Sequence, residues 1–168
     1  MGKYNKSLTA TVYIINENKV LLHQHRKYHT WFPVGGHIEA DELPHNAAKR
    51  EVKEEAGLDV SIIDMSSDCF NVGKVCRVPL PVAVYHEGIN SGEEFLDFIY
   101  IALTDTNELK GEDGESTVFR WFSMEELLDK NEDIKLHIRN TAIRCLSYIM
   151  KKNGADFSEE YFTDDENL

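Results

Sequence analysis

The chain is poor in positive charge. Its 168 residues include 18 Lys and Arg against 30 Asp and Glu, which gives a formal net charge of −12 at pH 7. A general nucleic-acid-binding protein needs a basic face to meet the phosphate backbone. The charge balance therefore argues against nucleic acid as a partner. A phosphate-bearing ligand would need positive charge from elsewhere, such as a divalent cation.

Long apolar runs and a cysteine pattern are also missing. No segment approaches the roughly 18 apolar residues of a membrane-spanning helix, and the first residues, MGKYNK, do not have the apolar core of a secretion signal. Cys69, Cys76 and Cys145 are an odd number and form no CxxC pair. We therefore expect a cytoplasmic protein with reduced thiols and no membrane association.

Length and charge distribution predict one domain followed by an acidic tail. A chain of this length can bury about two thirds of its unfolded surface as a single domain, which we place at residues 1–152. Residues 153–168 contain six acidic residues and no Lys or Arg. Such a segment is expected to be mobile, although Phe157, Tyr161 and Phe162 leave open that it packs on the domain.

Residue patterns predict a mixed sheet with helices packed on it. Strands are expected at residues 8–15, 20–25, 58–65, 75–85, 95–103 and 118–122, and helices at 44–56, 123–128 and 134–150. The first two strands are typical of a hairpin. Pro79 and Pro81 cannot donate to a sheet, so their segment is expected at an edge or in an irregular stretch. The order of these elements predicts an α/β or α+β fold.

One predicted helix concentrates negative charge. Within 44–56, Glu51, Glu54 and Glu55 fall on one face, where each like-charged pair destabilises the helix by about 0.2–0.5 kcal/mol. A solvated surface, with Arg50 and Glu54 forming an i, i+4 pair, is one explanation. A site for a divalent cation is the other.

The second explanation is chemically consistent. Carboxylate oxygens are hard ligands that suit Mg²⁺ or Mn²⁺. A cation would offset the repulsion among the glutamates and neutralise a diphosphate, and it would polarise phosphorus and activate water. The Gly35–Gly36 turn lets the main chain approach closely because no Cβ intervenes, so that a carbonyl there could act as a further oxygen ligand.

The residues around the glutamates form an extended pattern. The stretch from Gly36 to Leu58, GHIEADELPHNAAKREVKEEAGL, matches G-x5-E-x7-R-E-U-x-E-E-x-G-U, where U is aliphatic, at every fixed position. This pattern resembles the signature of the Nudix hydrolase superfamily, with its MutT-like members. The segments WFP upstream and RWFSMEEL downstream are also similar to that superfamily, so the resemblance spans roughly residues 8–150.

The resemblance implies a fold and an activity. It implies an α/β/α sandwich with a mixed central sheet, and an Mg²⁺- or Mn²⁺-dependent pyrophosphohydrolase in which water attacks phosphorus of a nucleoside diphosphate linked to X. A nucleoside triphosphate or an oxidised nucleotide would be one such substrate, and the enzyme would be a monomer or a homodimer. Two alternatives are a non-catalytic nucleotide-sensing module, which often lacks these glutamates, and an enzyme similar to isopentenyl-diphosphate isomerase, which needs a suitably placed cysteine.

The resemblance also implies roles for individual residues. The catalytic and metal-binding residues would be Glu51, Glu54 and Glu55, the carbonyl of Gly35, and Glu115 on a later loop, with Glu112 as the second choice for that last position. The structural brace of the motif would be formed by Gly36, Glu42, Arg50 and Gly57.

Four further residues are candidates for contacting the substrate. Arg26 lies in HQHRKYH, which favours an exposed basic hairpin end over a phosphate-facing patch or a transition-metal site. His37 follows the Gly–Gly turn and either touches a phosphate or caps the loop. His86 ends a strand expected to border the cleft. Asp97 lies in an apolar strand, where it is either buried and paired or directed into the pocket.

Overall fold

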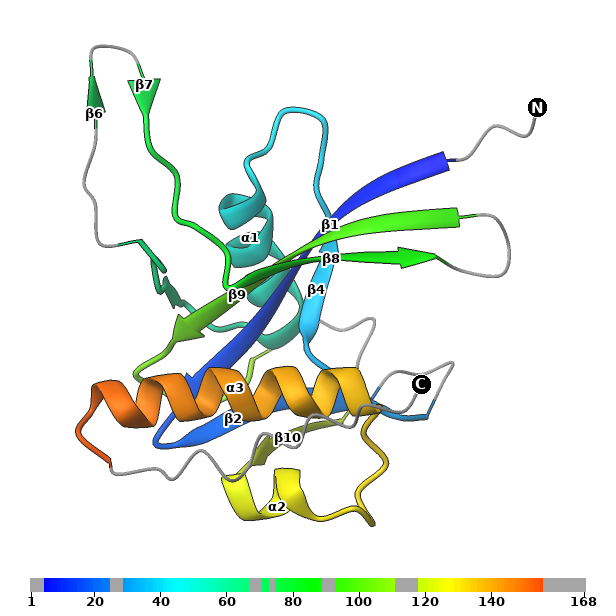
Figure 1. Cartoon of the computed structure of the whole chain (residues 1–168), viewed down its shortest axis with the longest axis vertical. Helices are drawn as coiled ribbons and strands as arrows, with labels where there is room; N and C mark the ends of the chain where they lie inside the picture. Colours follow the sequence, from blue (N-terminus) through cyan, green and yellow to red (C-terminus); the bar gives the residue numbers. More distant parts are fainter. Residues whose placement is uncertain are drawn as a thin grey trace.

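The computed structural model describes residues 5–24, 29–66, 71–72, 75–88, 93–110 and 118–155. The elements along the chain are β1 (Asn5–Asn16), β2 (Lys19–Gln24), β3 (Trp31–Phe32), β4 (Val34–His37), α1 (Pro44–Ala56), β5 (Ser61–Ile62), β6 (Asn71–Val72), β7 (Val75–Cys76), β8 (Ala83–Gly88), β9 (Glu93–Leu103), β10 (Phe119–Phe122), α2 (Met124–Leu128) and α3 (Leu136–Lys152) (Figure 1). The expected acidic tail falls almost entirely at 156–168, outside the described residues.

Most strands join one mixed sheet. Its order is β10-β2-β1-β9-β5, with β3 added to β2, β4 to β1 and β8 to β9, while β6 and β7 pair separately. The central pair, β1 and β9, is parallel, and the other pairs are antiparallel. β1 has two partners along its other edge, because β4 pairs with its residues 9–12 and β2 with its residues 14–16.

The two faces of the sheet are covered by different helices. Successive residues of a strand point to opposite faces, and in β1 the even-numbered Ala10, Val12 and Ile14 pack in one core cluster with residues of α1. The odd-numbered Tyr13 and Ile15 belong to a second cluster with residues of α3. In Figure 1, α3 crosses in front of the sheet and α1 lies behind it. The α/β/α arrangement expected from the sequence is confirmed.

α1 begins and ends at the residues that the sequence predicts. Pro44 occupies its first turn, and Gly57 follows its last residue with a left-handed φ of 69° and donates its N–H to the carbonyl of Lys53. A Cβ at Gly57 would overlap the backbone of Lys110. Glycine is therefore required at this position both for its conformation and for the space it leaves.

Elsewhere the strands and helices differ in length from the predictions. The strand expected at 58–65 reduces to β5, because only Ser61 and Ile62 pair, with the end of β9. The segment 75–85 is interrupted around its prolines, as expected, and β8 begins only at Ala83. α3 begins at Leu136 rather than Ile134, although Ile134 is still buried, and it ends at Lys152 rather than Met150.

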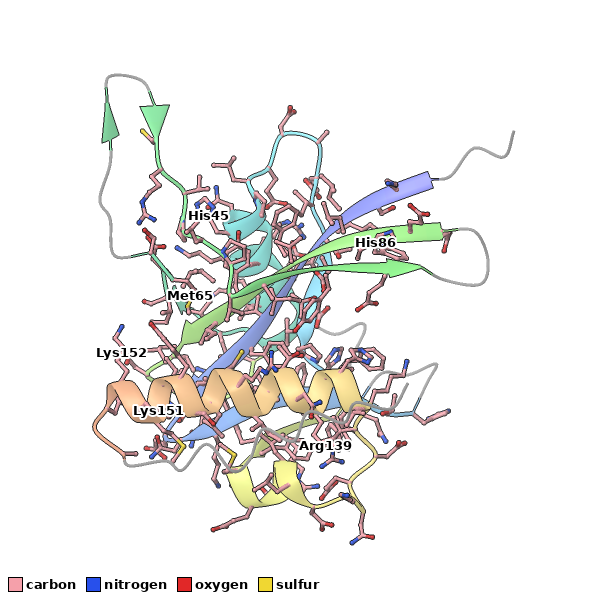
Figure 2. The ribbon with its side chains drawn as sticks, in the orientation of Figure 1. His45, Met65, His86, Arg139, Lys151 and Lys152 are labelled. Atoms are coloured by element: carbon pink, nitrogen blue, oxygen red, sulfur yellow. The ribbon has the colours of Figure 1, made fainter. Side chains whose placement is uncertain are left out.

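The short helix α2 is fixed at both ends. Ser123 and Glu126 form a reciprocal capping box at its N-terminus. At its other end the buried guanidinium of Arg139, from α3, donates to the carbonyls of Leu127, Asp129 and Glu132 (Figure 2). In the part of the chain that the structure describes, no helix is long and apolar enough to cross a membrane.

Candidate active site

A cavity of about 860 Å³ opens on the face of the sheet that α3 covers in part. Its floor consists of odd-numbered residues of three neighbouring strands, which share this face: Thr9, Thr11 and Tyr13 of β1, Phe95, Asp97 and Ile99 of β9, and Tyr85 and Glu87 of β8. The N-terminal turn of α3 contributes His137 and Ile138. The motif contributes Gly35, Gly36, Arg50, Glu51 and Glu55.

The two glycines, expected in a turn, lie in β4, where Gly36 faces α1 and Gly35 lies against β1. Gly36 pairs with Ala10, and a Cβ at Gly36 would overlap the carboxylate of Glu51. Gly35 pairs with Thr11, and a Cβ there would come within 2.6 Å of the carbonyl oxygen of Ala10. The carboxylate of Glu51 therefore reaches the cavity through space that any other residue at position 36 would fill.

Glu55 lies beside a histidine of β2. Its Oε2 is 4.0 Å from Nε2 of His23, and both side chains are only 12% exposed. His23 also stacks on Phe119, with ring centroids 5.8 Å apart. The sequence interpretation of His23 as part of an exposed basic hairpin end is therefore wrong for this residue. His23 shares its face of β2 with Leu21, which packs in the core cluster with residues of α1, and it lines the cavity beside Glu55.

Arg50 makes more contacts than an i, i+4 pair. Its guanidinium donates to Glu42 at 3.0 Å, to Glu51 at 2.8 Å and to the carbonyl of His37 at 2.9 Å, as well as to Glu54 at 3.1 Å. The hydrogen bonds with Glu42 raise the pKa of Arg50 and lower the pKa of Glu42. These bonds connect the loop before α1 to the glutamates of α1.

Glu54 is placed differently from the other two glutamates. Its side chain is 56% exposed, it pairs with Arg50, and it does not line the cavity. Among the residues described, no three His, Cys, Asp or Glu side chains are grouped closely enough to hold a metal ion. The structure thus brings Glu51 and Glu55 to the cavity, while Glu54 remains bonded to the guanidinium.

Two of the four residues expected to contact the substrate line the cavity. His37 is exposed at its margin, edge-on to Phe95 with ring centroids 6.0 Å apart. Asp97 lies in the floor, where Thr9 and Thr11 donate hydrogen bonds to its carboxylate at 2.9 and 2.8 Å. The sequence left open whether Asp97 is paired or directed into the pocket, and in the structure it is both.

The other residues lie elsewhere. His86 does not line the cavity, because alternation along β8 places Tyr85 and Glu87 on the cavity face and His86 on the opposite one. His86 pairs with Glu94 at 3.5 Å and is 61% exposed (Figure 2). Arg26, Glu112 and Glu115 are outside the described residues. Of the cysteines, Cys76 is exposed and Cys145 is buried, and neither lines the cavity.

Comparison with known proteins gives the same result as the motif and the fold. The NUDIX domain family matches residues 5–141. The chain belongs to the NUDIX family. It is a Nudix hydrolase, and members of this family act on small-molecule nucleotides with the help of divalent metal ions.

Solved structures of other proteins have the same fold. A NUDIX-family hydrolase from Clostridium perfringens is 34% identical, with a TM-score of 0.78 over 86% of this chain and 99% of that one. A MutT NUDIX hydrolase from Burkholderia pseudomallei is 17% identical, with a TM-score of 0.62 over 83% and 97% of the two chains. A UDP-X diphosphatase is 13% identical, with a TM-score of 0.60 over 91% and 66%. No match was found among curated proteins.

Proposed function

We propose that this Nudix hydrolase is a pyrophosphohydrolase that cleaves a nucleoside diphosphate linked to X by attack of water on phosphorus, with Mg²⁺ or Mn²⁺ as cofactor. The observation that carries the proposal is the position of Glu51 and Glu55, which line one cavity together with the Gly35–Gly36 strand. A cavity of about 860 Å³ is within the range of ordinary small-molecule sites.

The residues present fit a hard divalent cation. The donor set consists of carboxylates and a main-chain carbonyl, which Mg²⁺ and Mn²⁺ prefer, and the missing Cβ of Gly36 leaves the carboxylate of Glu51 its place. Glu51, Glu55 and the carbonyl of Gly35 would hold the ion. When bound, it would neutralise phosphate oxygens and lower the pKa of water. Glu54 remains a proposed ligand, and Glu115 is proposed as a further ligand or as the general base.

The remaining residues of the motif position these groups. Arg50 fixes the carboxylate of Glu51 and, through Glu42 and the carbonyl of His37, the loop between β4 and α1. Gly57 allows the chain to turn directly after α1. This arrangement supports the proposal that Arg50, Glu42, Gly36 and Gly57 act as a structural brace.

Replacing Glu55 tests the proposal. Wild-type protein and Glu55→Gln would be assayed with Mg²⁺ and with Mn²⁺ against nucleoside triphosphates, oxidised nucleotides, dinucleoside polyphosphates and nucleotide sugars, by chromatographic detection of the nucleoside monophosphate and of the pyrophosphate or phosphorylated X released. Reactions in ¹⁸O-labelled water would show whether the label appears on phosphorus. Loss of even an outer contact to a metal ligand costs about 10–100-fold, so we expect Glu55→Gln to cost more than about 100-fold at unchanged melting temperature.

Glu125→Gln is the control, because this exposed residue of α2 does not line the cavity. It should retain wild-type activity. Full cation-dependent activity of Glu55→Gln would contradict the proposed role of Glu55. Inactivity of the wild-type protein on every substrate would favour a nucleotide-sensing module instead.

A further inference from the structure

Strand pairing places Asp97 in a row of residues that crosses the cavity floor. Asp97 on β9 is opposite Thr9 on β1 and Tyr85 on β8, and Thr9 is opposite His37 on β4. Neighbouring strands lie about 4.8 Å apart, so the backbone of Asp97 is about 10 Å from β4, two strands away. Glu51 of α1 meets the cavity at β4. A substrate whose diphosphate lies at the glutamates of α1 can therefore extend its other end over Asp97.

The carboxylate of Asp97 is held with acceptor capacity to spare. The hydroxyl of Thr9 donates to Oδ1 and that of Thr11 to Oδ2, so each oxygen has one fixed hydrogen bond from β1. An ionised carboxylate offers about four lone-pair positions, two on each oxygen. Each oxygen can consequently accept one more hydrogen bond. Because the threonines fix the carboxylate, these two acceptors form a preorganised pair that lines the cavity.

The surroundings of Asp97 do not fully stabilise the negative charge of its carboxylate. Burial raises the pKa of its carboxyl more than the two threonine hydrogen bonds lower it, and the nearby charge of Glu87 raises it further. Additional hydrogen bonds from a ligand would offset part of this cost. Since Glu87 also lines the cavity, this region suits an uncharged or cationic group rather than a phosphate.

Aromatic rings stand next to this pair of acceptors. Phe95 precedes Asp97 by two residues on β9 and so shares its face, and Tyr85 lies opposite on β8. The Tyr85 hydroxyl is occupied by a hydrogen bond of 3.0 Å with Thr141 of α3, which fixes the ring. Flat apolar surfaces beside two acceptors suit a ring that carries its donors on one edge.

We propose that Asp97 is a specificity-determining residue that binds two adjacent hydrogen-bond donors on the part of the substrate that carries no phosphate. This inference rests on the proposed function, because it takes the diphosphate to lie at the glutamates of α1. Two common groups have this chemistry. Guanine carries adjacent N–H donors on its Watson–Crick edge, and the vicinal diol of ribose carries two hydroxyls. Adenine, cytosine and uracil place an acceptor next to each donor.

Deleting one donor at a time tests the inference. In the base arm, kcat/KM of the wild-type enzyme is compared for GTP and for ITP, which lacks the 2-amino group. In the sugar arm it is compared for a ribonucleotide and its 2′-deoxy form. We expect a decrease of about 10- to 100-fold in one arm, as for loss of one hydrogen bond to a charged group. Asp97→Asn keeps only one acceptor oxygen. In this variant the ratio of kcat/KM between the two substrates should fall to less than about 3-fold.

Two variants control for charge and for packing. Glu87→Gln removes a negative charge from the same cavity and should change kcat/KM by a similar factor for all substrates. Thr11→Val removes one of the hydroxyls that fix Asp97 and should weaken the discrimination in part, in the same arm. Melting temperatures of all variants would show that they are folded. Unchanged discrimination in folded Asp97→Asn, or none in either arm for the wild type, would overturn the inference.

Failure of the proposed function would be recognised separately. The same comparisons are made by calorimetric binding of GMP, IMP and 2′-deoxy-GMP, which requires no turnover. The wild-type protein could be inactive and still bind one of these ligands more tightly than the ligand that lacks a donor, with this preference lost in Asp97→Asn. In that case Asp97 is a specificity residue and the hydrolase proposal fails. If Glu55→Gln abolishes activity but Asp97→Asn lowers kcat/KM by the same factor for every substrate, the hydrolase proposal stands and the inference about Asp97 fails.

Discussion

The carboxylates of Glu51 and Glu55 on α1 line the same cavity as the carboxylate of Asp97, but Glu51 and Asp97 are stabilised in different ways. Glu51 accepts a charge-assisted hydrogen bond from Arg50, the residue that precedes it in the chain. Asp97 accepts hydrogen bonds only from uncharged threonine hydroxyls on another strand, among the contacts of the described residues. Glu51 thus belongs to a local cluster that includes the positive charge of Arg50. Asp97 is a partly buried negative charge without a positively charged partner among the described residues.

We expect this difference to correspond to the two tasks of the proposed pyrophosphohydrolase. A cluster of carboxylates held near a guanidinium is suited to exchange contacts with a metal ion and phosphate oxygens. A lone carboxylate on a rigid sheet is suited to accept hydrogen bonds from a neutral group at a fixed position. We therefore expect substitutions in the two regions to affect different measurements.

The largest expected effect is on metal binding. Glu55→Gln should weaken Mn²⁺ binding by more than about 100-fold, measured by electron paramagnetic resonance of the free ion or by calorimetry. Glu54→Gln should weaken it less, because this exposed side chain bonds to Arg50 outside the cavity. Asp97→Asn should leave the Mn²⁺ affinity unchanged. A loss in Asp97→Asn equal to that in Glu55→Gln would show that the two regions form one site.

Gly36→Ala should have the next largest effect. The added Cβ overlaps the carboxylate of Glu51 and must displace it. Misplacing a catalytic group by about 1 Å can cost about 100-fold, so we expect a decrease of up to that factor in kcat. Gly88→Ala is the matched control, since a Cβ at this strand position has open space around it. Equal activity of the two variants would contradict the role given to the missing Cβ.

Arg50→Lys should have a smaller effect, of about 10-fold in kcat/KM. Lysine keeps the positive charge but cannot donate at the same time to Glu42, Glu51 and the carbonyl of His37 as the guanidinium does. Because Arg50 does not contact Asp97, the discrimination between GTP and ITP, or between ribose and deoxyribose, should persist. Loss of that discrimination in Arg50→Lys would show that the two regions are coupled.

The smallest expected effects concern stability, and they have opposite signs. Interaction with Arg50 lowers the pKa of Glu42, so its stabilising contribution is present above the pKa of the unfolded chain and is lost as pH falls through the lower folded value. Burial raises the pKa of Asp97, so the folded state binds the proton more tightly. Stability is then lost as pH rises from the unfolded pKa through the folded one.

Urea unfolding at acidic and neutral pH measures both contributions. The free energy of unfolding of Glu42→Gln should fall furthest below that of the wild type at neutral pH. For Asp97→Asn, the free energy of unfolding relative to the wild type should be higher at neutral than at acidic pH. The same pH dependence in both variants would contradict the opposite pKa directions of the two regions. Glu125→Gln again serves as a control without a cavity contact.

The sequence predicts α1 and its motif well, but it predicts poorly the contacts that depend on distant parts of the chain. Pro44 and Gly57 define both ends of α1, and the motif places the glutamates, because these signals act within one helix and its flanking turns. The exposure of Glu54 and the burial of His23 depend on which elements lie beside them. The partners of Asp97 depend on strand register, which no local pattern in residues 95–103 specifies.

The parallel pairing of β1 with β9 also has a consequence for the order of folding. The hydrogen bonds that fix Asp97 join residues separated by 86 and 88 positions along the chain, and closing such long loops is slow. During synthesis, the β1–β2 hairpin and α1, which lie within residues 5–57, are made before β9. The carboxylates of α1 can thus be in place earlier than the surface that would discriminate between substrates.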